Sequence, residues 1–366
     1  MLNGRAKERI MASIASSSGG EAAISGFLAR RHARHILVLC LLTGGVFVFL
    51  VLNVAIGSVY IPAMDAASIV FRGRESSELF GAVIWDIRLP RALAGLLGGA
   101  MLAVAGLLLQ VFFRNPIVGP GILGITSGAS LMVSLVMLGG LAVGAASLGP
   151  LYLSAAALLG AMGVMLVIMA VASKVRDILT LLVVGLMVGF MASSVGSFLV
   201  AFAEESRVHT FVSWSLGSFA GFRWDEVGIM GAACAVLCSA SFFLAKWLNA
   251  FLLGENYAQS MGVNVKLFRY LVVVLSSGLA AAVTAFAGPV AFIGLAVPHI
   301  ARLFLGSSDN RILIPGCILL GAIVTSLCDL LARTLFSPVE LPISATTALF
   351  GAPIVIGLVL KRRTSI

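Results

Sequence analysis

Hydrophobic residues in this chain form long runs that are separated by short clusters of charge. The most extensive run extends from Asn115 to Ser173 and contains no Asp, Glu, Lys or Arg over 59 residues. A hydrocarbon core about 30 Å thick is crossed by roughly 20 apolar helical residues. This run alone is therefore long enough for two membrane crossings.

The same pattern over the whole chain predicts about ten transmembrane helices. They extend approximately over residues 36–58, 92–113, 121–140, 148–173, 179–203, 228–246, 267–287, 290–304, 312–336 and 344–360. The eighth is short and is interrupted by Gly288, Pro289 and Pro298, so we expect a bent or incomplete span there. Alternating strand patterns are absent and the runs are too long for barrel strands, so the predicted fold class is all-α and polytopic.

Composition agrees with a membrane protein. Hydrophobic residues make up 60% of the 366 residues and charged residues only 11%, and the mean hydropathy is +1.11. A soluble protein of this length with an ordinary surface does not have such a composition.

Lysine and arginine predict the orientation. With both termini in the cytoplasm, 17 of the 24 basic residues fall on the cytoplasmic side and 7 on the other side, as the positive-inside rule requires. The net charge of +9 is thus explained by the membrane topology and by attraction to anionic lipid. It gives little support to a role in nucleic-acid binding.

The N-terminal 35 residues are a mixture of Ser, Gly and Arg without apolar periodicity. We expect residues 1–35 to be a flexible, basic cytoplasmic tail and residues 36–366 to form the transmembrane domain. A cleaved signal peptide is the weaker alternative, because the first apolar segment begins only near Ile36 and is long enough to span.

Several kinds of chemistry are disfavoured by what the sequence lacks. It has no Gly-Lys dipeptide, hence no Walker A loop, and neither an HExxH nor a GxSxG motif. Its four histidines lack metal-ligand spacing, and its five cysteines all fall inside predicted helices. No metal site, bound cofactor or catalytic residue is predicted, and transport remains as the broad class.

The energy source of transport separates two hypotheses. A stand-alone, ion-coupled carrier usually places ionisable groups near the bilayer middle. Here the clear example is Asp329, with Arg333 one helical turn later. A local ion pair that steadies the helix end is the favoured interpretation of these two residues, and a coupling-ion site is the alternative.

An external energy source needs a docking surface in the cytoplasm, and residues 248–264 offer one. Gly254 can end a first short helix, Glu255 favours the start of a second, Ala258 and Met261 are expected to face one side, and Gly262 ends the second helix. An amphipathic elbow without a basic face favours a protein partner over the lipid surface.

A set of motifs in one fixed order resembles the FecCD family of iron-complex and cobalamin permeases. The matches comprise Arg88-Leu89-Pro90-Arg91, Gly98–Gly106, Arg114-Asn115-Pro116, Gly119-Pro120-Gly121, Leu253–Gly262, Gly288–Leu295, Pro298-His299, Asp329–Arg333, Glu340-Leu341-Pro342-Ile343 and Gly351-Ala352-Pro353. The resemblance covers nearly everything after the tail.

The resemblance implies a type II ABC importer in the bacterial inner membrane. Its expected partners are a second permease copy (an identical chain or a close paralogue), two cytoplasmic ATPase subunits that bind the ATP and Mg²⁺, and a periplasmic or lipid-anchored substrate-binding protein. The cargo would be a ferric siderophore, haem or cobalamin. An iron complex is favoured, because it is the more frequent cargo among members of the family.

The resemblance also implies roles for individual residues. Gly254, Glu255, Ala258 and Gly262 would contact the ATPase. Arg88, Arg91 and Arg333 would receive acidic residues of the binding protein; interfacial anchoring of Arg88 and Arg91, and the pair with Asp329 for Arg333, are the alternatives. Asn115 and Ile117 would form part of a cytoplasmic gate. The pathway would lie between two copies, along the helix that carries Ser193 and Ser197, and would be inert so that the cargo is released.

Overall fold

The computed structural model describes residues 20–57, 61–73, 80–139, 150–175 and 178–363, and regular structure in these ranges is helical. Seven helices are long and apolar enough to cross a membrane, and three shorter apolar helices accompany them in the described part of the chain. Together they correspond to the ten predicted segments. They are α2 (Gly20–Ala55), α5 (Leu89–Phe112), α6 (Ile125–Met137), α7 (Pro150–Lys174), α8 (Ile178–Phe202), α10 (Trp224–Phe243), α13 (Val265–Ala287), α14 (Ile293–Leu305), α15 (Asn310–Thr334) and α16 (Ile343–Arg363).

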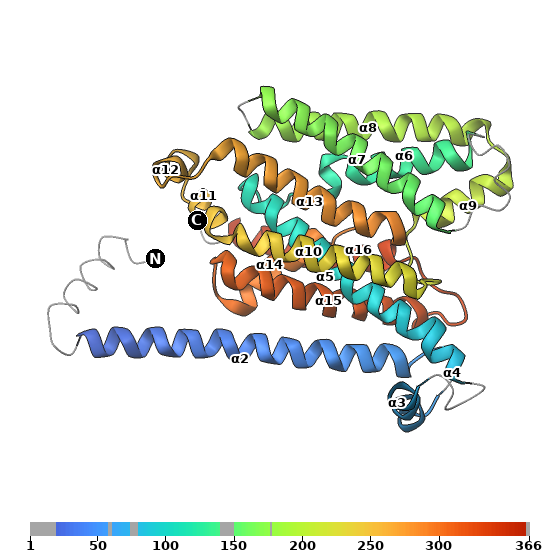
Figure 1. Ribbon diagram of the computed structural model, residues 1–366, viewed down its shortest axis with the longest axis horizontal. Helices are drawn as coiled ribbons and strands as arrows, with labels where there is room; N and C mark the ends of the chain where they lie inside the picture. The colour runs from blue at the N-terminus through green and yellow to red at the C-terminus, as the bar shows by residue number, and fades with distance from the viewer. Residues whose placement is uncertain (1–19, 58–60, 74–79, 140–149, 176–177, 364–366) are drawn as a thin grey trace.

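These helices lie side by side along one direction, with α2 at one margin of the bundle and α7 and α8 at the other (Figure 1). Short elements cover the two ends. The left end in Figure 1 carries α11 (Ala245–Leu252) and α12 (Glu255–Ser260), and the right end carries α3 (Ala63–Arg72), α4 (Phe80–Ala82) and α9 (Glu205–Ser215). The positive-inside rule makes the left end cytoplasmic.

Helix α2 starts earlier than the sequence pattern predicts. It begins at Gly20, inside the stretch expected to be a flexible tail, and continues to Ala55. Its first three turns, residues 20–31, contain three Ala and two Arg, residue types with high helix propensity even without apolar periodicity. Residues 1–19 lie outside the described part of the chain, so the expected flexibility is untested there.

Helix α5 is the centre of the bundle. Nearly all of its residues are buried, and it packs most extensively against α15 and also against α13, α14 and α10. Glycines permit this close approach: a Cβ atom on Gly99 would lie 2.2 Å from the carbonyl oxygen of Gly321 on α15. Small residues are how membrane helices gain packing energy where lipid offers no hydrophobic driving force.

Helices α6 and α14 are too short to span. Each has 13 residues and rises about 20 Å, less than the hydrocarbon core of about 30 Å. The 3₁₀ helix η3 (Pro120–Leu123) precedes α6, and the non-helical residues 288–292 precede α14. The predicted incomplete eighth span is thus confirmed, whereas the shortness of α6 was not predicted, because apolar residues continue past its end.

We expect the Gly99→Ala variant to be less stable, with a loss of about 1–3 kcal/mol in the free energy of unfolding, because the added methyl group would separate α5 from α15. The melting temperature of the purified protein in detergent measures this. Gly163→Ala on α7 is the matched control, since no atom lies within 4 Å of its added Cβ. Equal melting temperatures for the two variants would contradict the packing account.

Candidate functional site

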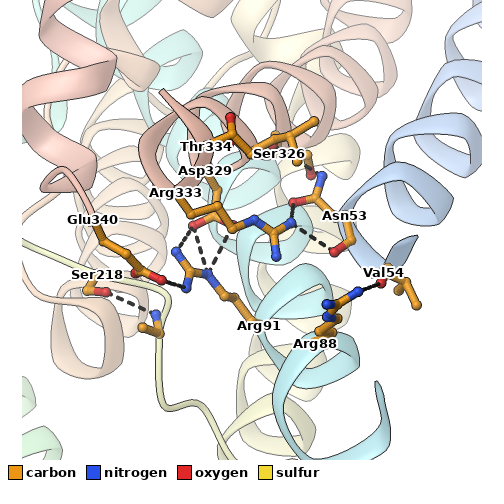
Figure 2. Close-up of polar contacts among 12 residues, drawn as sticks. Asn53, Val54, Arg88, Arg91, Ser218, Ser326, Asp329, Arg333, Thr334 and Glu340 are labelled. Carbon is orange, nitrogen blue, oxygen red and sulfur yellow. Dashed lines mark hydrogen bonds and ion pairs between the residues drawn. The ribbon is translucent and has the colours of Figure 1, made fainter. Parts of the chain in front are cut away.

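The predicted docking arginines lie together at the outer end of α5 and α15 (Figure 2). Arg91 on α5 donates to Asp329 on α15 through Nε and Nη2, with donor–acceptor distances of 3.0–3.1 Å. Its Nη1 donates to both carboxylate oxygens of Glu340 at 3.0 Å. Arg91 therefore bridges the carboxylates of Asp329 and Glu340.

Arg333 joins the same carboxylate from its own helix. Its Nε is 3.9 Å from Oδ2 of Asp329, which is an ion pair but too long for a hydrogen bond. Its Nη2 donates to Asn53 on α2, to the backbone oxygen at 2.8 Å and to Oδ1 at 2.6 Å. Asn53 in turn donates to the carbonyl oxygen of Ser326 at 3.2 Å, so α2 is tied to α15.

Arg88 makes a separate contact with α2. Its Nη1 donates to the carbonyl oxygens of Val54 and Ala55 at 2.8 and 2.9 Å. These are carbonyls of the last turn of α2, which lack intrahelical partners and carry the negative end of the helix dipole. Arg88 thus caps the outer end of α2.

These three arginines are buried within the chain, with 4–8% of each residue exposed. The local Asp329–Arg333 pair anticipated from the sequence is present, and Arg91 and Asn53 extend it into a network. Within the network, the side chain of Glu340 is the exposed member, at 49%. Docking of a partner protein by the arginines stays a prediction, and it would engage guanidinium groups that already hold α2, α5 and α15 together.

Sequence reasoning missed Asn53 and the role of Glu340. A signal for Asn53 was available, because it is an isolated polar residue in the apolar run Phe47–Val54, and an amide within a membrane span normally has a partner. The pairing of Arg91 with Asp329 carries no local signal, since the two residues are 238 positions apart.

The cytoplasmic elbow has the shape that the sequence predicts. Gly254 separates α11 from α12 with φ of 128°, and Gly262 follows α12 with φ of 83°, values that favour glycine. Glu255 starts α12 and accepts from Nη2 of Arg269 on α13 at 2.8 and 3.0 Å. This half-buried ion pair attaches the elbow to a long helix of the bundle.

The outward surface of the elbow is made by residues other than those expected. Ala258 is fully buried against the chain, whereas Met261 is 60% exposed, so the prediction that both face one side is wrong. Helix α12 ends at Ser260, and the i, i+3 relation does not extend past a helix end. Leu253 and Tyr257, at 67% and 48% exposed, complete an apolar surface with Met261.

The turn after α5 contains the predicted gate residues. Oδ1 of Asn115 accepts from the backbone N–H of Ile117 at 3.0 Å, and Ile117 is 48% exposed. Arg114 precedes them with φ of 48°, an uncommon backbone conformation for a residue other than glycine. Its guanidinium lies 5.0 Å from the ring centre of Phe251 on α11, so a cation–π contact connects the turn to the elbow.

The predicted pathway residues lie on α8. Ser193 and Ser197 are exposed in the single chain; Ser193 donates to Oγ of Ser127 on α6 at 3.3 Å, and Ser197 to the carbonyl of Ser193 at 3.0 Å. Each hydroxyl therefore has a partner within the chain. Large apolar side chains are exposed beside them, including Phe190, Met191 and Phe198 at 58%, 70% and 64%.

The described part of the chain has the features of a multi-pass transmembrane permease of the ABC importer type. These features are the membrane helices, the two short helices among them and the elbow on the cytoplasmic side. The sequence profile of the FecCD transport family matches residues 41–361. The chain belongs to this family, and it is a multi-pass protein of the bacterial inner membrane.

Named relatives align with this chain over nearly its full length. The vitamin B12 import system permease protein BtuC of Salmonella arizonae is 36% identical over 91% of this chain and 95% of its own length. BtuC of Klebsiella pneumoniae is 35% identical over 91% of this chain and 96% of its own length. These relatives are permease proteins of an import system.

Solved structures support the fold. One, described as an inward-facing conformation of a metal-chelate type ABC transporter, superposes with a TM-score of 0.77 at 31% identity, over 88% of this chain and 99% of that chain. Another, of PsaBC from Streptococcus pneumoniae in complex with Fab, superposes with a TM-score of 0.50 at 14% identity. That superposition covers 73% of this chain and 89% of the other chain. The second shows a likeness of fold alone.

We expect Asp329→Asn to lower the free energy of unfolding by about 3–5 kcal/mol, because it leaves the buried guanidinium of Arg91 without its main counter-charge. The melting temperature in detergent measures the loss. Glu340→Gln is the comparison, because its half-exposed carboxylate contributes only about 0–1 kcal/mol. If both variants melted at the same temperature, Asp329 would not be the anchor of this network.

Proposed function

We propose that this chain is the transmembrane permease of an ABC importer that carries a large metal chelate into the cytoplasm. A separate ATPase supplies the energy, and a substrate-binding protein delivers the cargo. The observation that carries the proposal is the elbow of α11 and α12, which presents Leu253, Tyr257 and Met261 to the cytoplasm and is anchored to α13 by the Glu255–Arg269 ion pair.

An apolar surface on a short, well-anchored element suits docking of a partner protein. Aromatic and methionine side chains are enriched at protein interfaces, and the elbow presents one of each. A rigid-body push on the elbow would reach α13 through Arg269 and the turn of Asn115 and Ile117 through the Arg114–Phe251 contact. Gly254 and Gly262 supply the bends, and Ala258 supports the elbow from beneath.

The second permease copy is proposed to pack along α8. That helix buries one side rich in small residues against its own bundle and exposes Phe190, Met191 and Phe198 on the rest. Pairing two copies there would place Ser193 and Ser197 near a pathway between them. An identical copy and a close paralogue are both compatible with this face.

The cargo is proposed to be a corrinoid or a comparable chelate, such as a ferric siderophore or haem. The named relatives at 35–36% identity import vitamin B12, which favours a corrinoid over the iron complex expected from family frequency. The exposed residues of α8 carry no charge, and such a wall would bind a chelate weakly enough to release it.

The alternative, an ion-coupled carrier, gains no support from Asp329. Its carboxylate accepts hydrogen bonds from Arg91 and is 3% exposed. A coupling site needs a carboxylate that exchanges its ion during the cycle. Asp329 is instead held by two arginines.

We expect the double variant Leu253→Ala/Tyr257→Ala to bind the cognate ATPase at least about tenfold more weakly, since truncating buried anchor side chains of an interface typically costs 1–2 kcal/mol or more. Copurification and the dissociation constant in detergent measure this. Tyr152→Ala on α7, whose tyrosine is 43% exposed, is the control and should bind as the unmodified chain does. ATPase binding that survives in the double variant would remove the elbow from the proposed interface.

A further inference from the structure

A cavity of about 680 Å³ lies at the cytoplasmic ends of α7 and α13, beside the elbow helix α12. Its size is within the range of about 300–1,000 Å³ that is typical of ligand sites. Two of its lining residues, Glu255 and Arg269, form the ion pair that anchors the elbow, but no role has been assigned to the cavity itself. Its wall combines a basic rim with an apolar inner side.

The rim carries an excess of positive charge. Lys174 is the last residue of α7, and Lys266 and Arg269 belong to the first turns of α13. Among the described residues of this lining, Glu255 is the one carboxylate, and it is paired with Arg269. Both lysines are exposed and have no acidic partner within the described part of the chain.

Arg269 retains unused hydrogen-bonding capacity. Its side chain is 14% exposed; Nη2 donates to Glu255, and Nη1 donates to the carbonyl of Val175 at 3.4 Å. Its Nε–H is buried and has no partner among the described residues. A buried donor without an acceptor is costly, and an anion in the adjacent cavity would lower that cost.

The inner side of the cavity is apolar and lies toward the membrane. Met169 and Ala172 on α7 and Val273 on α13 form it. Lys174 ends the apolar span Tyr152–Lys174, so the rim lies at the level of the lipid headgroups. Tyr270, which also lines the cavity and is 49% exposed, is a residue type enriched at that level.

We propose that this cavity binds the phosphate headgroup of an anionic phospholipid from the cytoplasmic leaflet. Lysine and arginine recognise phosphate through charge-assisted hydrogen bonds, and basic pockets between helices on the cytoplasmic side suit lipid headgroups. The apolar inner wall favours a lipid over a free phosphate, because it can accept the start of the acyl chains. Glu255 and Gln259 of α12 line the same cavity, so a bound headgroup lies against the elbow.

The test uses the full chain in detergent, titrated with phosphatidylglycerol or phosphatidylcholine and followed by native mass spectrometry. We expect selective binding of phosphatidylglycerol. The double variant Lys174→Gln/Lys266→Gln should bind it about thirtyfold more weakly, from about 1 kcal/mol for each basic residue. Lys174→Arg/Lys266→Arg should retain binding.

The matched control is Lys246→Gln/Arg311→Gln, which removes two exposed charges from the same end of the bundle but not from the cavity. It should bind as the unmodified chain does. Equal binding of the two lipids, or unchanged selectivity in Lys174→Gln/Lys266→Gln, would overturn the proposal. Displacement of phosphatidylglycerol by millimolar inorganic phosphate would overturn the lipid as the source of the phosphate. The assay contains no ATPase, so its outcome is independent of the proposed importer function.

Discussion

The hydrocarbon of the bilayer supplies no hydrogen bonds, and the structure follows from that constraint. Backbone groups are satisfied within helices, and α5 is enclosed by neighbours that approach through Gly99 and Gly321. The short helices α6 and α14, with the irregular segments before them, are tolerated because they pack against other helices of the chain. Charge is consequently confined to the two ends of the bundle, and the candidate docking, gate and coupling residues lie there as well, whereas the candidate pathway residues lie within α8.

The two ends are built differently. At the outer end, Arg91, Asp329, Arg333 and Asn53 form a buried network that joins α2, α5 and α15. At the cytoplasmic end, the half-buried Glu255–Arg269 ion pair holds α12 against α13, and Asn249 joins α11 to the start of α15 through hydrogen bonds with Asp309 and Asn310, while the apolar residues of the elbow are exposed. Buried polar networks tend to fix one arrangement, whereas the more exposed contact leaves a surface on which a partner can act.

The sequence predicts the helices well because each depends on a local property, the absence of charge over about 20 residues. It also places the elbow, since Gly254, Glu255 and Gly262 act through local backbone geometry. It fails where distant segments meet: the Arg91–Asp329 pair and the Arg114–Phe251 contact join residues far apart in the chain, and no periodicity records them. The opposite exposure of Ala258 and Met261 was missed because α12 ends at Ser260, so Met261 lies just past the helix end. The early start of α2 was missed because the residues before Ile36 were interpreted as lacking apolar periodicity.

The central claim is that the energy for transport enters from outside this chain through its cytoplasmic elbow. Uptake of labelled cyanocobalamin, haemin and a ferric hydroxamate into proteoliposomes, with a cognate binding protein present, tests it most directly. The account predicts accumulation of one of these chelates against its gradient only when the ATPase and ATP are included. Accumulation by the permease without an ATPase, driven by a proton or sodium gradient, would contradict it.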